Sequence, residues 1–205
     1  MSDSDAHRAF ESAGAFLRGH FVYTSGRHGA DYLEKFRILQ DPRATSELAG
    51  MIVERFRSLK PELVAGPTTG GIILAYEVAR QMGVDAVYVE RGEPGGRVLR
   101  RGFEILPDTR VMVVDDVVTT GGSLIETQAC ITNAGGVVIG IGVLADRTAG
   151  RVATDVPFYA CLTVDFPSYM PDACPLCASG VPVAPPRGSK IKFPSPSGGG
   201  SGWGR

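Results

Sequence analysis

The apolar positions of this chain follow two alternating patterns: short runs that are almost wholly apolar, and longer segments with apolar residues three and four apart. The runs predict strands at 62–66, 85–90, 110–114, 137–146 and 156–164, the last at an edge of the sheet. The periodic segments predict helices at 72–83 and 123–136. Strands that are apolar on both faces and alternate with helices are typical of a parallel sheet covered on both sides. We therefore predict an α/β fold with a doubly wound, mostly parallel sheet.

The first sixty residues have a different pattern. Apolar residues at helical spacing predict an amphipathic helix over residues 5–18 that ends at Gly19. Residues 20–39 read as two short extended pieces around a polar turn at 25–29, and Pro42 opens a helix that runs to about Leu59.

The length of 205 residues favours a single domain with appendages. We place this domain at residues 1–183, with a small N-terminal hood at about 8–40, a core at about 41–165 and a Pro-rich end at 166–183. Residues 184–205 form a low-complexity tail of Pro, Gly and Ser, which we expect to be disordered because it offers little apolar surface to bury.

Composition and charge exclude several classes of protein. The chain has 21 Lys and Arg against 22 Asp and Glu, so its net charge of −1 gives no general field for nucleic acid. No segment approaches the roughly 20 apolar residues of a membrane span, and the N-terminus lacks the pattern of a signal peptide. We expect a cytoplasmic protein with no membrane partner.

The four cysteines do not resemble a secreted disulfide framework, so reduced thiols are expected. Cys174 and Cys177 have the spacing of half a zinc site, but the sequence shows no second pair and no nearby histidine that completes it. The histidines His7, His20 and His28 lack metal spacing. We therefore expect no structural metal within one chain, while completion of the pair across a dimer stays open.

The segment 111–123, VMVVDDVVTTGGS, carries the most specific chemistry. In an open parallel sheet ligands bind beyond the carboxyl ends of the strands, where Asp115 and Asp116 emerge. The two glycines that follow allow a ligand to approach the backbone, and the helix that begins at Ser123 favours an anion at its N-terminus. No lysine of a nucleoside triphosphate loop is present, so a single phosphate fits better. Paired carboxylates accept hydrogen bonds from vicinal hydroxyls or hold a divalent cation, and sugar hydroxyls beside a phosphate indicate a ribose 5-phosphate.

Over its whole length this segment resembles the phosphoribosyl pyrophosphate signature of the type I phosphoribosyltransferases. The segments 19–42 and 144–150 resemble the N-terminal hood and the orotate-contacting arginine segment of the orotate phosphoribosyltransferases, and the resemblance covers about residues 8–182, including a Pro-rich end like that of a bacterial branch. It implies transfer of ribose 5-phosphate from 5-phosphoribosyl 1-pyrophosphate (PRPP) to orotate, giving orotidine 5′-monophosphate and pyrophosphate in pyrimidine biosynthesis, with Mg²⁺ as cofactor and no metal ligand assigned to the protein.

The resemblance also implies the residues of the site. PRPP would be bound by Asp115, Asp116, Val117, Val118, Thr119, Thr120, Gly121, Gly122, Ser123, Thr69 and Gly70. Orotate would be bound by Thr119, Arg147, Arg27 and Tyr32. Catalysis would depend on Asp115, Asp116, Arg91, Arg97, Arg100 and Arg101. A planar guanidinium suits the carboxylate of orotate, although Arg147 could instead pair with Asp146 at the surface.

Residues 91–101 form a loop with four arginines and three glycines and without apolar periodicity. Such a loop could neutralise a departing pyrophosphate when the site closes. In the family it reaches the neighbouring subunit, which implies a homodimer; a solvated hairpin is the plainer alternative. Family members commonly carry lysines and a histidine here, so which arginine replaces them stays open.

Two other functions share the central signature. A purine phosphoribosyltransferase differs in the hood, and a regulator could keep the pocket as a PRPP sensor without catalysis. The absence of a DNA-binding extension and the near-neutral charge count against the regulator.

Overall fold

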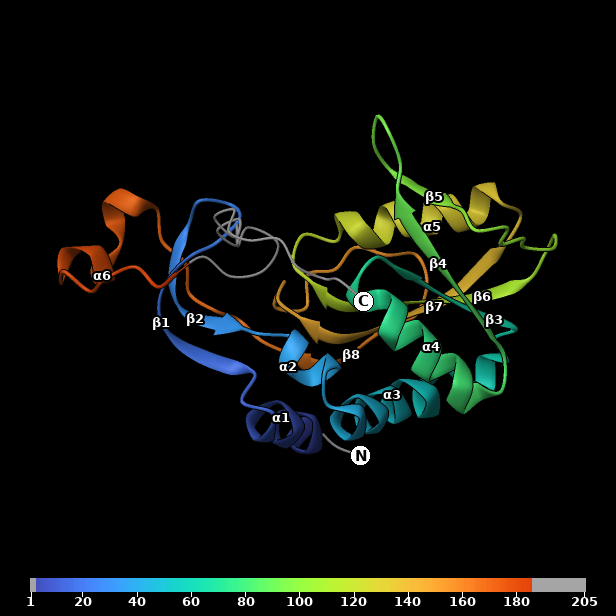
Figure 1. Cartoon of the computed structure of the whole chain (residues 1–205), viewed down its shortest axis with the longest axis horizontal. Helices are drawn as coiled ribbons and strands as arrows, with labels where there is room; N and C mark the ends of the chain where they lie inside the picture. The colour runs from blue at the N-terminus through green and yellow to red at the C-terminus, as the bar shows by residue number, and fades with distance from the viewer. Residues whose placement is uncertain (1–2, 186–205) are drawn as a thin grey trace, which may run out of the picture. The chain divides into compact units, whose positions relative to one another are not determined.

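The computed structural model describes residues 3–185, which form two compact units that we describe separately (Figure 1). The larger unit comprises residues 3–17 and 33–166, and the smaller unit comprises 18–32 and 167–185. The segments 8–17 and 33–40, which we expected in the hood, thus group with the core. Most of the expected disordered tail, residues 186–205, lies outside the described residues.

The larger unit is built on a six-stranded sheet. Its strands are β3 (Leu63–Pro67), β4 (Asp85–Arg91), β5 (Arg97–Leu99), β6 (Arg110–Val118), β7 (Val137–Asp146) and β8 (Phe158–Thr163), in the order β5-β4-β3-β6-β7-β8. Neighbouring strands pair in parallel except β5, which runs antiparallel to β4. The prediction of a doubly wound, mostly parallel sheet with a late edge strand is confirmed.

The helices of this unit are α1 (Asp3–Ser12), α2 (Phe36–Leu39), α3 (Pro42–Phe56), α4 (Gly70–Met82) and α5 (Gly122–Asn133), with a 3₁₀ turn at Arg57–Leu59. The carboxylate of Asp41 accepts hydrogen bonds from the first amides of α3, and Pro42 occupies the first turn, where no N–H is needed. Gly83 ends α4 in the left-handed conformation, with φ of 76°. These local signals explain why the predicted bounds of α3 and α4 agree with the structure to within about three residues.

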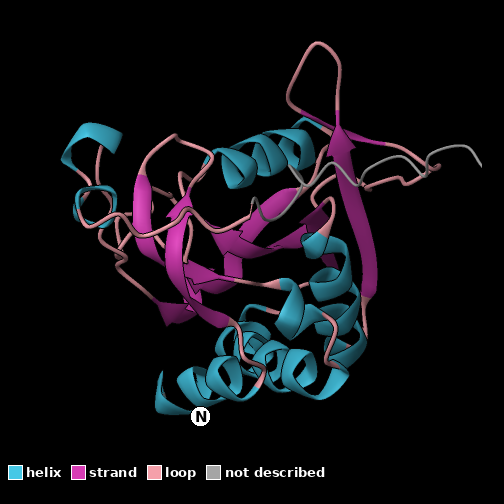
Figure 2. Ribbon diagram, turned by 60° about the vertical axis from the view of Figure 1, so that its left-hand side comes forward, coloured by secondary structure: helices cyan, strands magenta, loops and turns pink. Residues whose placement is uncertain are grey.

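Helices cover both faces of the sheet (Figure 2). Strand β6 shows why: Met112 and Val114 pack into a core with α3 and α4, whereas Val111 and Val113 pack into a second core with α5. Alternate residues of a strand point to opposite faces, so a strand buried on both sides has no polar face. Within residues 3–185, no helix is both long enough and apolar enough to cross a bilayer.

One local prediction was wrong, and at a second place the structure decides between two alternatives. The first helix ends at Ser12 rather than continuing to residue 18, because Gly14 adopts a φ of 64° and turns the chain into strand β1 (Phe16–Val22). The apolar spacing continued across the turn because both elements place side chains in the same region, and Phe10 and Phe16 lie 6.0 Å apart between ring centroids. The basic loop 91–101 contains strand β5, which pairs with β4 to form a hairpin.

The smaller unit is built on the two-stranded sheet of β1 and β2 (His28–Leu33), which confirms the two extended pieces of the hood. Its second segment contains a 3₁₀ turn at Pro171–Ala173 and the short helix α6 (Pro175–Ala178). The two segments are joined by a pair of backbone hydrogen bonds between His28 and Tyr169, each 2.8 Å long.

The fold also overturns the expectation that no histidine lies near the cysteine pair. His20 and His28 on the hairpin lie beside Cys174 and Cys177. The sequence could not reveal this contact, because about 150 residues separate the two segments along the chain.

Candidate active site

The carboxyl ends of β3 and β6 lie side by side at the point where the sheet changes direction. The chain leaves β3 through α4 to reach β4 on one side, and leaves β6 through α5 to reach β7 on the other. The connections diverge at this point, and α4 and α5 both begin just beyond it, so amides of both helix N-termini are available to an anion there. This is the expected ligand position in a doubly wound sheet.

Strand β6 carries two buried carboxylates to this edge. Asp115 is 7% exposed and Asp116 is 2% exposed. Both Asp116 oxygens lie close to the ammonium nitrogen of Lys35, at 2.8 Å for Oδ1 and 2.7 Å for Oδ2. The backbone amide of Asp116 donates to Asp115 Oδ1 at 2.8 Å, and that of Val117 donates to Asp116 Oδ1 at 2.6 Å. One cation and two amides therefore offset part of the repulsion between the two carboxylates.

The remaining repulsion and the burial change the titration of Asp115. Burial raises the pKa of the Asp115 carboxyl to about 7, and the neighbouring charge of Asp116 adds to this rise. Hydrogen bonding by the Asp116 amide and the Ser123 hydroxyl, together with the charge of Lys35, acts in the opposite direction. Without a ligand, the pair is thus an electrostatically costly arrangement, of the kind that is frequent at functional sites.

The loop after β3 approaches the carboxylates very closely. A Cβ atom placed on Gly70 would lie 1.7 Å from Asp116 Oδ2 and 2.9 Å from a methyl group of Leu39. No side chain fits there, so glycine is required at the first residue of α4. This contact brings Thr69 and Gly70, both predicted to bind PRPP, to the carboxylate pair.

The loop after β6 is the segment predicted to form a phosphate cup. Gly121 has a φ of 82°, which bends the chain so that α5 begins at Gly122. Thr119 and Thr120 are exposed, and Gly121, Gly122 and Ser123 are partly buried. The first amides of a helix have no intrahelical acceptor, so hydroxyls and amides together can donate to an anion.

Arg97 is the loop arginine that the structure brings to this cup. From strand β5 its guanidinium donates to the hydroxyl of Ser123 at 2.9 Å and to the hydroxyl of Thr68 at 3.3 Å. Its side chain is 6% exposed and lies 3.5 Å from a carboxylate oxygen of Glu126. Arg97 thus connects the loop after β3 with the start of α5.

The other three loop arginines, Arg91, Arg100 and Arg101, are exposed. Arg101 forms a 2.8 Å ion pair with Glu90, and this pairing lowers the pKa of the Glu90 carboxyl. Their predicted catalytic roles stay predictions.

Arg147 follows β7 at the same edge of the sheet. Its backbone amide donates to the carbonyl of Val118 at 2.9 Å, which places it beside the start of the phosphate cup and next to Thr119. Its guanidinium lies 5.4 Å from the ring centroid of Phe166. The buried carboxylate of Asp146 accepts hydrogen bonds from the amides of Thr148 and Gly150 and so shapes the loop that carries Arg147.

Arg27 and Tyr32 belong to the smaller unit. Arg27 donates to the hydroxyl of Ser168 at 2.9 Å and to the Ser168 carbonyl, and Tyr32 lies 5.4 Å from Phe21 between ring centroids. Their contact with orotate stays a prediction.

Sequence reasoning missed Lys35. It lies between β2 and α2, a region we read only as an extended piece, and no motif marks it. Its place directly before the short helix α2 was the only available signal. Its partner Asp116 is 81 residues away along the chain.

Comparisons with known proteins bear on this site. Residues 37–171 match the model of the phosphoribosyl transferase domain. The chain is 45% identical over 191 residues to the orotate phosphoribosyltransferase of Pelotomaculum thermopropionicum, covering 93% of this chain and all of that protein. It is 43% identical over 182 residues to that of Desulforamulus reducens, covering 89% and 95% of the two chains. The chain belongs to the orotate phosphoribosyltransferase family.

A solved structure agrees with this assignment. The orotate phosphoribosyltransferase of Aeropyrum pernix is 29% identical and superposes with a TM-score of 0.63, over 77% of this chain and 92% of that chain. An adenine phosphoribosyltransferase from Rhodothermus marinus has a similar fold, with a TM-score of 0.60 and 22% identity. The fold is thus common to enzymes for different bases, and the relatives in sequence favour orotate over the purine alternative.

Proposed function

We propose that this chain, as an orotate phosphoribosyltransferase, breaks the bond between C1′ of PRPP and pyrophosphate and forms a bond between C1′ and a ring nitrogen of orotate. The leaving pyrophosphate takes the electron pair of the broken bond, and the ring nitrogen of orotate gives up its proton to the pyrophosphate or to water as the new bond forms. The observation that carries this assignment is the buried Asp115–Asp116 pair beside the Thr-Gly-Gly-Ser cup at the switch point of the sheet.

The ribose phosphate would lie at the carboxyl end of β6. In this proposal the 5′-phosphate accepts hydrogen bonds from the cup between Thr119 and Ser123, at the N-terminus of α5. The 2′ and 3′ hydroxyls donate to Asp115 and Asp116. Donation from a hydroxyl adds one more hydrogen bond to each carboxylate, so binding of the sugar relieves part of the electrostatic cost of the pair.

The pyrophosphate would lie toward the loop after β3. Thr69 and Gly70 lie at the N-terminus of α4, where backbone amides can approach phosphate oxygens without interference from a side chain. The guanidinium of Arg97 lies between this loop and the phosphate cup, and it is the arginine best placed to contact either anion.

Orotate would lie between the sugar and Arg147. The backbone hydrogen bond from Arg147 to Val118 places the arginine beside Thr119, so both can face one ligand. The carboxylate of orotate suits two-point binding by a guanidinium. Arg27 and Tyr32 are proposed as further orotate ligands on the family resemblance.

Catalysis would come from positioning and electrostatics. Positive charge develops on the ribose as the bond to pyrophosphate breaks, and the two buried carboxylates stabilise that charge more strongly than water does. Holding orotate in line with C1′ removes much of the entropic cost of the reaction.

Mg²⁺ fits this donor set as an ion carried by the substrate. Asp116 is already neutralised by Lys35, and Mg²⁺ commonly takes most of its ligands from phosphates and water with one or two carboxylates. When bound, it would neutralise charge on the pyrophosphate. The protein groups available beside it are Asp115 and the amides at Thr69 and Gly70.

We further propose that the enzyme is a cytoplasmic homodimer in which the hairpin 91–101 of one subunit reaches the site of the other. The exposure of Arg91, Arg100 and Arg101 supports this, because exposed guanidinium groups are available to an anion bound in a neighbouring subunit.

The decisive experiment follows the ultraviolet absorbance of orotate with purified protein, PRPP and Mg²⁺, and compares hypoxanthine as the base. Turnover of orotate alone is expected. Asp116→Asn should abolish turnover while preserving the circular dichroism spectrum, and Asp155→Asn, at an exposed position, is the matched control. A wild-type rate for Asp116→Asn would contradict the role assigned to the pair.

A further inference from the structure

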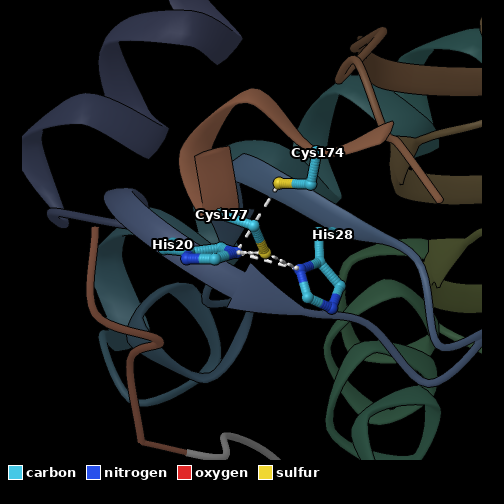
Figure 3. Close-up of side chains that lie close together, drawn as sticks. All are labelled: His20, His28, Cys174 and Cys177. Carbon is cyan, nitrogen blue, oxygen red and sulfur yellow. Dashed lines mark hydrogen bonds between the residues drawn. The ribbon is translucent and has the colours of Figure 1, made fainter. Parts of the chain in front are cut away.

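Four metal-binding side chains converge in the smaller unit (Figure 3). His20 projects from β1 and His28 from the start of β2. Cys174 immediately precedes α6, and Cys177 lies within it. One ligand atom from each residue lies within 4.8 Å of all the others. Figure 3 shows the two imidazoles and two sulfur atoms directed toward a common point.

The distances are those of a tetrahedral zinc site. With Zn–N of about 2.05 Å and Zn–S of about 2.3 Å, ideal tetrahedral angles put nitrogen and sulfur about 3.6 Å apart and two nitrogens about 3.3 Å apart. His20 Nε2 lies 3.7 Å from Cys174 Sγ and 3.6 Å from Cys177 Sγ, and His28 Nδ1 lies 3.3 Å from Cys177 Sγ. The two nitrogens are 2.9 Å apart, a few tenths of an ångström less than the tetrahedral value.

A second layer of contacts orients His20. Its Nδ1 lies 2.7 Å from the carbonyl oxygen of Val181, so this nitrogen carries the proton and donates it. The lone pair is then on Nε2, the atom that faces the sulfur atoms. A carbonyl that holds the outer nitrogen of a ligand histidine is a common feature of metal sites. The backbone carbonyl of His20 also accepts from the amide of Ala184 at 2.7 Å, so the chain on both sides of the ring is held.

The smaller unit has a physical need for such a site. Its described residues number only 34, from 18–32 and 167–185, and its buried hydrophobic side chains are Phe21 and Cys174. Compact units below about 40 residues usually require a metal, disulfides or a partner to fold, because they bury too little apolar surface. The cluster joins the hairpin to the C-terminal segment at the place where that stabilisation is required.

We propose that His20, His28, Cys174 and Cys177 bind one structural Zn²⁺ ion per chain. Each thiol releases its proton on binding, so two thiolates balance the charge of the ion and the site is neutral overall. Two thiolates and two imidazoles in tetrahedral geometry favour Zn²⁺ among the common divalent ions. All four ligands come from one chain. Protein side chains fill all four coordination positions of the ion, which is typical of a structural rather than a catalytic zinc.

The first test measures metal content in protein purified without a polyhistidine tag and without chelators. Inductively coupled plasma mass spectrometry should find close to one zinc per chain. Titration of the wild-type protein with a mercurial should release that zinc as the thiols react. Replacement by Co²⁺ should give the visible absorption of a tetrahedral ion together with a thiolate charge-transfer band.

Variants assign the ligands. Cys177→Ser is the most informative, since Cys177 is exposed and its replacement costs little packing. It should lose the zinc, the cobalt spectrum and the dependence of melting temperature on chelator, and His28→Ala should do the same. Cys130→Ser and His7→Ala change the same residue types in the larger unit, and both should retain all three properties.

Several results would overturn the proposal. One is that the purified protein holds no zinc and also fails to bind added Zn²⁺ or Co²⁺. Another is that Cys177→Ser keeps its full metal content. A third is that Cys174 and Cys177 form a disulfide in the metal-free protein under reducing conditions. Half an equivalent of zinc per chain would contradict a site built within one chain. None of these readouts depends on turnover, so failure of the proposed reaction would leave the result unaffected.

Discussion

The charge of Asp115 provides the most demanding prediction. The carboxyl has a pKa raised from 3.8 to about 7 by burial and by Asp116. Between these values the folded state holds a proton that the unfolded state has released, so the stability of the free protein falls as the pH rises through this interval. Stability from this group is therefore highest below about pH 4, and the loss is complete above about pH 7.

The magnitude follows from the size of the shift. A rise of about three pKa units corresponds to about 4 kcal/mol of lost stability above pH 7, as an upper limit for the isolated group. Asp115→Asn removes the charge and keeps the shape. The amide oxygen can still accept from the backbone amide of Asp116, as the carboxylate does at 2.8 Å. The amide nitrogen can use the hydroxyl of Ser123.

The free Asp115→Asn protein should thus be more stable than wild type at about pH 8, by an amount approaching the 4 kcal/mol limit, and nearly equal in stability at about pH 4. For a chain of this size, each kcal/mol changes the melting temperature by about 2–4 °C. The same variant should lose about 10²-fold or more in kcat/KM, because one of the two charges that stabilise the transition state is gone.

The assay is thermal and urea unfolding of the ligand-free protein at several pH values, with steady-state kinetics in parallel. Asp155→Asn serves as a control at an exposed aspartate. Equal pH dependence of stability for wild type and Asp115→Asn would refute the electrostatic account, and so would a variant that is less stable at alkaline pH.

Four other changes follow from contacts at the site. Gly70→Ala forces a Cβ against Asp116, and we expect weaker PRPP binding and a loss of about 1–3 kcal/mol in urea unfolding. Arg97→Lys keeps the charge but not the two hydroxyl contacts, and kcat/KM should fall at least about tenfold. Lys35→Met leaves Asp116 without its cation, so the free protein should lose stability at neutral pH, as measured by melting temperature. Turnover should stop when Mg²⁺ is omitted and resume when Mg²⁺ is added. This test must avoid chelators, because they would also remove the proposed zinc ion.

The sequence by itself determined the architecture of the larger unit. Strands such as Val111–Val114 are apolar on both faces, Pro42 and Gly83 mark helix ends, and the run from Asp115 to Ser123 places carboxylates and a phosphate cup at a strand end. These signals are local, since each depends on a few neighbouring residues. The error at Gly14 shows their limit, because apolar spacing alone does not reveal a turn when the following strand packs in the same region.

Only the tertiary structure decided which distant side chains meet. Lys35 reaches Asp116 across 81 residues, Arg97 reaches both Thr68 and Ser123 from an edge strand hidden in a basic loop, and His20 joins Cys174 across 154 residues. No local pattern encodes such pairs, since each is produced by the folding of separate elements onto one another. For this reason the sequence revealed the Thr-Gly-Gly-Ser turn and the cysteine pair, while the cation on the carboxylates and the two histidines beside the cysteines emerged only from the fold.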